Sequence, residues 1–459
     1  MNSFSKLAYK NIDEFVFGRS IYPVKLKNGI LIGGGTVIPE LNYTMPAIKI
    51  DHSTIKEVLN QYRDMTEDAC KRAVELYCKE FIIEAELLPP TTYHPEWGAA
   101  IVSEIRSVLN RFEAENDFKS AIRLTPVDIR EDPKSPHMWR GSHWDAIMQT
   151  FELGAEAGAD LLSIESIGGK DIHDDATMFC ELDKSIFSLG VLGVRDMHQV
   201  WDKISGISAS TDTISAGDTA CGFANTAMVL ADRGYIPKVF AAVVRVVSAV
   251  RSLAAIESGA VGPHKDCGYE GVFVKAITGT PISMEGKSSA VAHLSPVGNI
   301  AGCVADMWSN ESIQNIKLLG GMAPTVSAEQ LIYDCRLMNK ATEKGAQSAL
   351  LLRDLMADSD SYHDPQAYVL RPDVVLDLSE KIIAAKTPLE RSEVAARATL
   401  DTLQEANSSG ELHIEDKEMM WFDVFKRQLD SIPDNEDRFI GQMVDRCKND
   451  KFKPEKYDL

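Results

Sequence analysis

Short apolar runs alternate with amphipathic stretches through the first half of the chain. Five runs have the length and composition of buried strands: residues 81–87, 122–128, 161–165, 189–194 and 207–211. Stretches with helical periodicity precede the first four runs, at residues 53–78, 97–115, 143–157 and 174–186. Strands that are each separated by a helix indicate a parallel sheet joined by right-handed crossovers. The pattern therefore predicts an α/β fold.

Beyond residue 221 the strand pattern fades and helical periodicity dominates. Helices are expected near residues 223–233, 238–258, 288–308 and 327–357. Either a barrel with short last strands and long loops, or an open doubly wound sheet with a helical annex, would give this pattern. We favour a (β/α)8 TIM barrel, because five repeats occur without a dinucleotide fingerprint of the G-x-G-x-x-G type.

The two ends of the chain differ from the repeating middle. Residues 1–50 are rich in strand-forming residues, and the Asn28-Gly29 pair between two apolar runs predicts a hairpin with a type I′ turn. Residues 361–459 predict a helical extension, with helices near 374–385, 388–406 and 436–448. We therefore expect an N-terminal β-rich lead-in over 1–50, a barrel domain over 51–360 and a helical C-terminal extension over 361–459.

Composition and charge exclude some functions. The 459 residues carry 68 acidic and 48 basic side chains, a net charge of -20, which disfavours binding to nucleic acid or to an anionic membrane. The most apolar long stretch, residues 239–261, contains Arg245, Arg251 and Glu257. Three charges make a membrane span improbable, so we expect a buried core helix there. No secretion signal is visible at the N-terminus, and we expect a cytoplasmic protein.

Two of the eight cysteines lie in polar turns and are each followed by glycine. These are Cys221, ahead of a predicted helix, and Cys267, between charged residues. Glu165 ends a predicted buried strand, where a bare carboxylate would be costly. If they converge, two thiolates and one carboxylate form a three-ligand site with an open fourth position, the usual arrangement of catalytic zinc. Because the compartment is expected to be reducing, no disulfide is predicted.

Each of these residues also has a simpler interpretation. Glu165 could form an ion pair with a lysine or arginine, and either cysteine could be a packing residue. His264 could be a ligand or a proton relay, and His137 could lie in a substrate or partner loop. The remaining cysteines read as structural: Cys70, Cys78, Cys180, Cys303, Cys335 and Cys447.

Four segments around these residues resemble one known family. They are Ile38–Tyr43, 162–166, 217–222 and 262–270, and they closely resemble the zinc subunit of methanol:corrinoid methyltransferases, as does nearly the whole chain. The resemblance implies a (β/α)8 barrel with N-terminal and helical additions. It also implies one Zn²⁺ per chain held by Glu165, Cys221 and Cys267, a separate corrinoid protein that docks over the barrel mouth, and dimerised zinc subunits.

The chemistry implied by the resemblance is zinc-dependent methyl transfer from methanol to Co(I) of the partner's corrinoid. Zinc would polarise the C–O bond as a Lewis acid. Two thiolates and a carboxylate leave the zinc site with a formal charge of -1, so positioning of methanol must contribute as well. Asp218 and Asp266 are candidates for an acid that protonates the leaving oxygen. Two alternatives stay open: zinc-dependent alkylation of a thiol, and a non-catalytic scaffold for a corrinoid protein.

Overall fold

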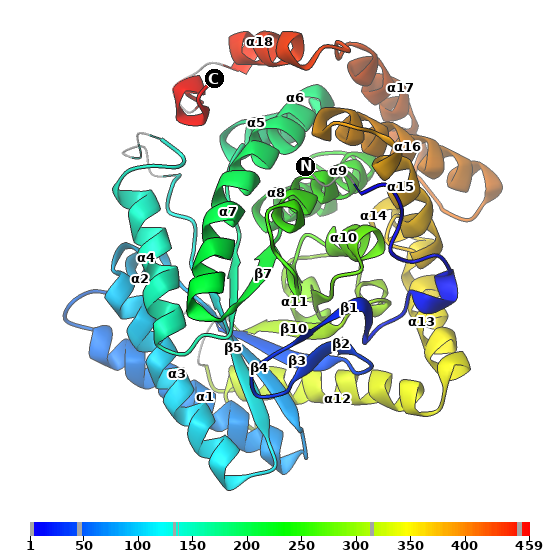
Figure 1. The fold of residues 1–459 in the computed structure, drawn as a ribbon. Coiled ribbons are helices and arrows are strands. Elements are labelled where there is room, and N and C mark those ends of the chain that lie inside the picture. Colours follow the sequence, from blue (N-terminus) through cyan, green and yellow to red (C-terminus); the bar gives the residue numbers. More distant parts are fainter. Residues whose placement is uncertain (1–3, 44–47, 132–134, 136, 313–315, 448–451) are drawn as a thin grey trace.

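Eight parallel strands form the centre of the protein. The computed structural model describes residues 4–43, 48–131, 135, 137–312, 316–447 and 452–459. The strands are ordered β7-β6-β5-β4-β3-β10-β9-β8 (Figure 1). A backbone hydrogen bond of 2.8 Å from Val261 to Ser215 brings the two sheet edges together, so the barrel is nearly closed. The strands are β3 Ile38–Tyr43, β4 Glu80–Glu86, β5 Lys119–Thr125, β6 Leu161–Ile164, β7 Ile214–Asp218, β8 His264–Asp266, β9 Ile282–Glu285 and β10 Met307–Ser312.

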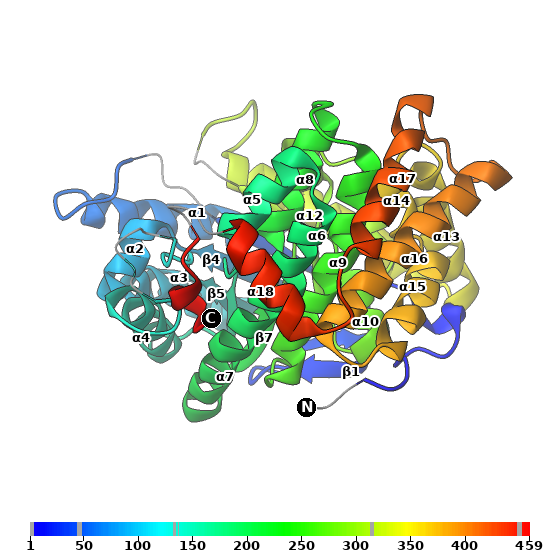
Figure 2. The same ribbon diagram turned by 90° about the horizontal axis from the view of Figure 1, so that it is seen from above.

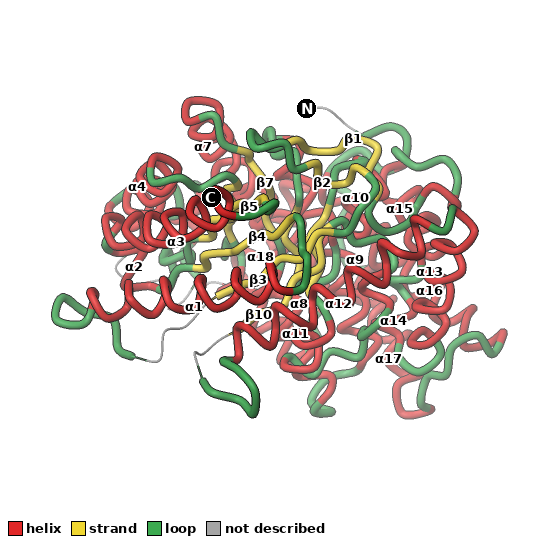
Figure 3. Tube along the Cα trace, turned by 90° about the horizontal axis from the view of Figure 1, so that it is seen from below, coloured by secondary structure: helices red, strands yellow, loops and turns green. Residues whose placement is uncertain are grey.

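Helices surround this barrel on the outside (Figure 3), which confirms the predicted (β/α)8 architecture. The first barrel strand, β3, lies within the N-terminal 50 residues and pairs with β4 and β10. The helices of this layer are α1 Ile55–Glu75, α2 Pro89–Tyr93, α3 Pro95–Glu115, α4 Ser142–Glu156, α5 Lys170–Phe179, α6 Leu182–Ile186, α7 Val194–Thr211, α8 Cys221–Asp232, α9 Lys238–Glu257, α10 Gly271–Thr278, α11 Lys287–Ala292 and α12 Ala323–Glu343.

A small antiparallel hairpin closes the N-terminal end of the barrel. Strands β1 (Arg19–Lys25) and β2 (Leu31–Gly34) form it, as the sequence predicts. The turn is not type I′, however, because only Gly29 has a positive φ and Asn28 does not. Apolar side chains of the hairpin pack against the first residues of the barrel strands: Val24, Leu26, Ile30 and Ile32 against Ile38, Ile82, Ala121, Leu161, Ala216 and Met307. The hairpin therefore covers the amino end of the barrel strands.

The C-terminal extension is helical, as predicted, with two helices that the sequence analysis missed, α14 and α17. Its last helix lies along α5 and α6, and the tail returns to the barrel (Figure 2). There the Tyr457 hydroxyl accepts a 2.9 Å hydrogen bond from the amide of Gly169, in the loop that follows Glu165. The extension therefore braces a loop of the barrel mouth. Helix α13, Ala346–Ser361, precedes the extension. The helices of the extension are α14 Pro365–Tyr368, α15 Pro372–Ala384, α16 Pro388–Ser409, α17 Asp416–Asp430 and α18 Glu436–Cys447.

Two of the five predicted strands are wrong. Residues 189–194 lie in a π-helical segment, Phe187–Gly193, and 207–211 are the last turns of α7. The first segment is buried on all sides, so its continuous apolar run resembles that of a buried strand. The true strand, β7, follows at Ile214–Asp218 with small residues and no apolar run. The helix expected near 288–308 is also wrong beyond α11, because β10 begins at Met307.

Helix α9 is the apolar segment with three charges, and it is a core helix as predicted. Among the described residues it alone is long and apolar enough to cross a membrane, and 94% of its most apolar stretch is buried inside the protein. Its two buried arginines bind loops at the barrel mouth. Arg251 donates to the carbonyl oxygen of Ser166 at 2.6 Å, and Arg245 donates to that of Gly268 at 2.5 Å.

Arg251 is therefore expected to be a major contributor to stability. Its guanidinium is fully buried beside Asp218, with 3.6 Å between Nη1 and Oδ1. Arg251→Met leaves that carboxylate buried without its cation, and we expect the free energy of unfolding to fall by about 3–5 kcal/mol. The matched control is Arg397→Met, which breaks an exposed pair with Asp430 and should cost less than about 1 kcal/mol. Equal losses in urea denaturation would contradict this role.

Candidate metal centre

Three loops at the carboxyl end of the barrel bring the predicted residues together. Glu165 directly follows β6, Cys221 is the first residue of α8, and Cys267 directly follows β8. One ligand atom from each residue lies within 4.8 Å of the other two. The carboxyl ends of parallel strands meet at one rim of a barrel, and this explains the convergence. Two sulfurs and a carboxylate oxygen at this spacing fit the donor set and reach of a zinc ion.

Cys221 and Cys267 are joined by a disulfide in the structure, so the expectation of free thiols is wrong for this pair. Their Cα atoms are 5.3 Å apart, the ordinary spacing for a disulfide. The same closeness lets both sulfurs reach one metal ion. Because a metal binds thiolates, the disulfide and the metal-bound form exclude each other. The other six cysteines are free, as expected.

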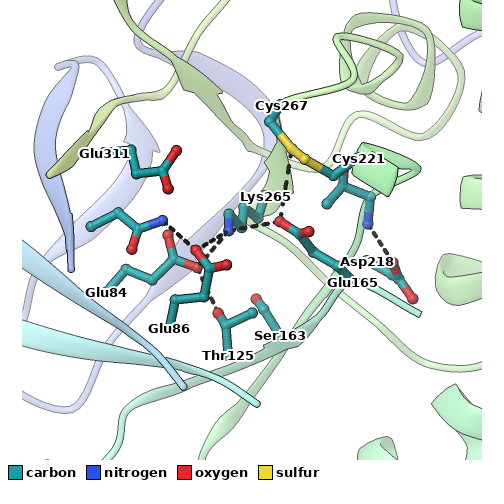
Figure 4. Close-up of polar contacts among 12 residues, drawn as sticks. Glu84, Glu86, Thr125, Ser163, Glu165, Asp218, Cys221, Lys265, Cys267 and Glu311 are labelled. Atoms are coloured by element: carbon teal, nitrogen blue, oxygen red, sulfur yellow. Dashed lines mark hydrogen bonds and ion pairs between the residues drawn. A yellow bond between two sulfur atoms is a disulfide. The ribbon is translucent and has the colours of Figure 1, made fainter. Parts of the chain in front are cut away.

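Lys265 was missed by the sequence analysis, and it lies at the centre of a cluster of carboxylates (Figure 4). Its buried ammonium is 2.9 Å from Glu165 Oε1, 3.1 Å from Glu84 Oε1 and 3.3 Å from Glu86 Oε2. Glu165 thus forms the ion pair considered for it, with Lys265, and its carboxylate also lies close enough to the two sulfurs to be a metal ligand. Burial raises the pKa of Glu84 to about 7, while the neighbouring carboxylates raise the pKa of Lys265. The cluster holds the Glu165 carboxylate beside the two sulfurs.

Asp218 supports the loops and does not point into the ligand group. It is fully buried, and its carboxylate accepts hydrogen bonds from the amides of Ser166 at 3.2 Å and Thr219 at 2.6 Å. Burial raises its pKa to about 6. The backbone of Asp266 ends β8, and its side chain lies outside the described part of the structure.

The histidines separate into buried, peripheral and site-facing ones. His264 is fully buried, and neither ring nitrogen has a hydrogen-bond partner among the described residues. His137 bonds Asp458 of the C-terminal tail at 3.0 Å. His293, which the sequence analysis passed over, bonds Glu311 at 3.2 Å and lies with Glu285 in a second group of ligand-type atoms within 4.8 Å of one another. His293 lies in a mainly apolar segment with no metal-binding motif, so no local signal marked it.

Comparison with known proteins decides the family. A model of the methanol-cobalamin methyltransferase B subunit family matches residues 1–458. The chain belongs to this family. It is 38% identical over 461 residues to the methanol–corrinoid protein co-methyltransferase of Methanosarcina barkeri, an alignment that covers 99% of this chain and 98% of that protein. The resemblance seen in the sequence is thereby confirmed.

A solved structure gives the same result at the level of the fold. The crystal structure of the methanol:cobalamin methyltransferase complex MtaBC from Methanosarcina barkeri matches with a TM-score of 0.93 and 37% identity over 99% of both chains. The chain described here is thus a methyltransferase with a TIM barrel. The barrel mouth with Glu165, Cys221 and Cys267 is its candidate metal centre.

His264 is expected to stay neutral and to make the protein sensitive to acid. Desolvation by burial lowers its pKa to about 4. Below about pH 6.5 the unfolded chain takes up a proton at this imidazole that the folded protein does not, so stability falls as the pH falls toward 4. Between pH 7 and pH 5, the free energy of unfolding of His264→Met should fall by about 2 kcal/mol less than that of the parent, as measured by urea denaturation. The control is His363→Met, at an exposed histidine, which should lose as much stability as the parent between pH 7 and pH 5. Equal losses in the two variants would refute a neutral His264.

Proposed function

We propose that this protein transfers the methyl group of methanol to Co(I) of a corrinoid carried by a separate protein, and that it uses one zinc ion held by Glu165, Cys221 and Cys267. The observation that carries the proposal is the convergence of two cysteine sulfurs and one carboxylate at the mouth of the barrel of a chain that belongs to this family. The Methanosarcina relative carries methanol and a corrinoid protein in its name, which supports the choice of substrates.

The zinc, when bound, acts as a Lewis acid that polarises the C–O bond of methanol. Three anionic ligands would leave this metal with a formal charge of -1. Lys265 places a positive charge 2.9 Å from Glu165, which offsets part of this excess negative charge. The ammonium thus lowers the electron density that Glu165 can supply to the metal and strengthens its polarising effect.

The other residues of the mouth hold the three ligand residues in place. Arg251 and Asp218 fix the loop after β6, while Arg245 fixes the turn that carries Cys267. We assign Asp218 to positioning, because its oxygens already accept backbone hydrogen bonds. A fixed centre presents methanol to an attacking cobalt in line with the C–O bond, and such orientation contributes strongly to rate.

The partner must approach from the carboxyl end of the barrel, because the β1–β2 hairpin fills the opposite end. We propose that the corrinoid protein docks over this mouth and that two copies of the present chain associate in the complex. Thiolate ligands need a reducing compartment, and this agrees with a location in the cytoplasm.

Methyl transfer is expected to depend on methanol, on the corrinoid and on the metal. Reduced protein, mixed with the corrinoid partner or with free cob(I)alamin, should form the methylated corrinoid when methanol is added. The loss of Co(I) absorbance measures this reaction. A chelator should abolish the reaction, and zinc should restore it. No transfer from fully zinc-loaded protein with its partner would refute the proposal. Methylation of a thiol without methylcobalamin would point instead to zinc-dependent thiol alkylation.

The ligand variants are expected to lose the metal before they lose the fold. Cys221→Ser, Cys267→Ser and Glu165→Gln each remove one of three protein ligands, so zinc per chain should fall at least about tenfold after dialysis against a chelator. The control is Cys447→Ser, at a buried thiol outside the centre, which should keep one zinc per chain. Metal analysis and alkylation mapping check this, because zinc should protect only Cys221 and Cys267. Full zinc content in the three variants would exclude this ligand set.

A further inference from the structure

One side-chain amide reaches the candidate metal centre from helix α8. Asn225 lies four residues after Cys221 in this helix, and its Nδ2 donates a hydrogen bond to Cys221 Sγ at 3.1 Å. Residues four apart lie one above the other on a helix, and helical side chains tilt toward the N-terminus. The helix itself therefore directs the amide to this sulfur, whether the sulfur is in a disulfide or binds a metal.

The orientation of the Asn225 amide has a cost for the protein. Its oxygen, Oδ1, is buried and has no hydrogen-bond partner among the described residues. A buried carbonyl oxygen without a partner is unfavourable. The reverse orientation would direct the lone pairs of Oδ1 at a sulfur that is negatively charged whenever it binds a metal. The fold thus keeps the N–H group on the sulfur and leaves the oxygen unpaired.

The amide has a second, longer contact on the side of β10. Asn225 Nδ2 is 3.5 Å from Nδ1 of His293, whose other ring nitrogen, Nε2, is 3.2 Å from Glu311 Oε2. A separation of 3.5 Å between two nitrogens is at the limit of a hydrogen bond. The shorter bond to Cys221 Sγ is therefore the one that orients the amide.

The sulfur benefits from such a donor because the ligand set is rich in negative charge. Two thiolates and a carboxylate give a bound Zn²⁺ a formal charge of -1. Lys265 Nζ lies 2.9 Å from Glu165 Oε1 and offsets the charge of one of these three ligands. Asn225 acts in the same direction on Cys221, since a hydrogen bond to a thiolate withdraws electron density from its sulfur. A ligand that donates less charge leaves the metal a stronger Lewis acid.

We propose that Asn225 is a positioning residue of the centre, whose N–H group orients the Cys221 thiolate and reduces the charge that this ligand donates to zinc. The inference rests on the proposed function. It adds no step to the reaction, because Asn225 exchanges neither a proton nor an electron.

The first test uses the full-length, reduced protein loaded with Co²⁺ in place of zinc and without the corrinoid partner. The thiolate-to-cobalt absorption band reports how readily sulfur gives up charge. Asn225→Leu removes the N–H group and keeps a helix-forming side chain of similar size. The band should move to lower energy, because a thiolate without the hydrogen bond gives up an electron more easily.

The matched control is Thr226→Val, at the next residue of α8. The Thr226 hydroxyl donates to the carbonyl oxygen of Gly222 at 3.1 Å and not to the sulfur. This variant therefore reports any general disturbance of the helix, and its band should stay at the parent position. Asn225→Gln keeps an amide N–H group on a longer stem, so its band should lie between those of the parent and Asn225→Leu.

The second test compares the zinc-loaded proteins in single-turnover methylation of the corrinoid by methanol. Loss of a residue that supports a metal ligand typically lowers activity by about 10–100-fold. The rate of Asn225→Leu with one zinc per chain should therefore fall at least about tenfold, while Thr226→Val should keep the parent rate.

Several outcomes would overturn the inference. They are an unmoved band in Asn225→Leu, an equal shift in Thr226→Val, and a rate that falls only in proportion to lost zinc. A zinc-loaded parent that transfers no methyl group would refute the proposed function, whereas the band shift would still test the hydrogen bond. If the parent transfers the methyl group and Asn225→Leu keeps both its band and its rate, the inference alone fails.

Discussion

The architecture of the barrel mouth depends on two arginines buried in one apolar helix. A buried guanidinium is costly unless its charge and donors are compensated, and the Nη groups of Arg245 and Arg251 on α9 donate to loop carbonyl oxygens, with Asp218 beside Arg251. The loops so bound are the ones that carry Glu165, Cys221 and Cys267. The same charges that argue against a membrane span thus fix the geometry of the candidate metal centre.

Charge is distributed unevenly along the barrel axis. Apolar side chains of the hairpin pack into the amino end of the barrel, whereas the mouth gathers carboxylates around Lys265 and around His293. Such a cluster is unfavourable unless cations and metal compensate it, so its members shift one another's pKa values.

Sequence reasoning succeeded where elements are long or chemically distinctive. It located β4, β5 and β6 and most of the long helices, because their periodicity is regular. It misplaced β7, whose residues Ile214–Asp218 include small and polar side chains, and took the buried segment Phe187–Gly193 for a strand. The three-residue strand β8 is too short to show any pattern, and tertiary pairing with β9 alone makes it a strand.

The sequence by itself determined the fold class, the family and the residues able to bind a metal, since periodicity and the Cys-Gly turns are local properties. Only the tertiary structure decided what surrounds them. Lys265, His293 and Glu311 come from separate elements and meet at the barrel rim because parallel strands end there together. Likewise, a Cα separation of 5.3 Å across 46 residues of chain is what lets Cys221 and Cys267 either form a disulfide or share a metal. Distances of this kind arise from the packing of the whole barrel, and no local pattern encodes them.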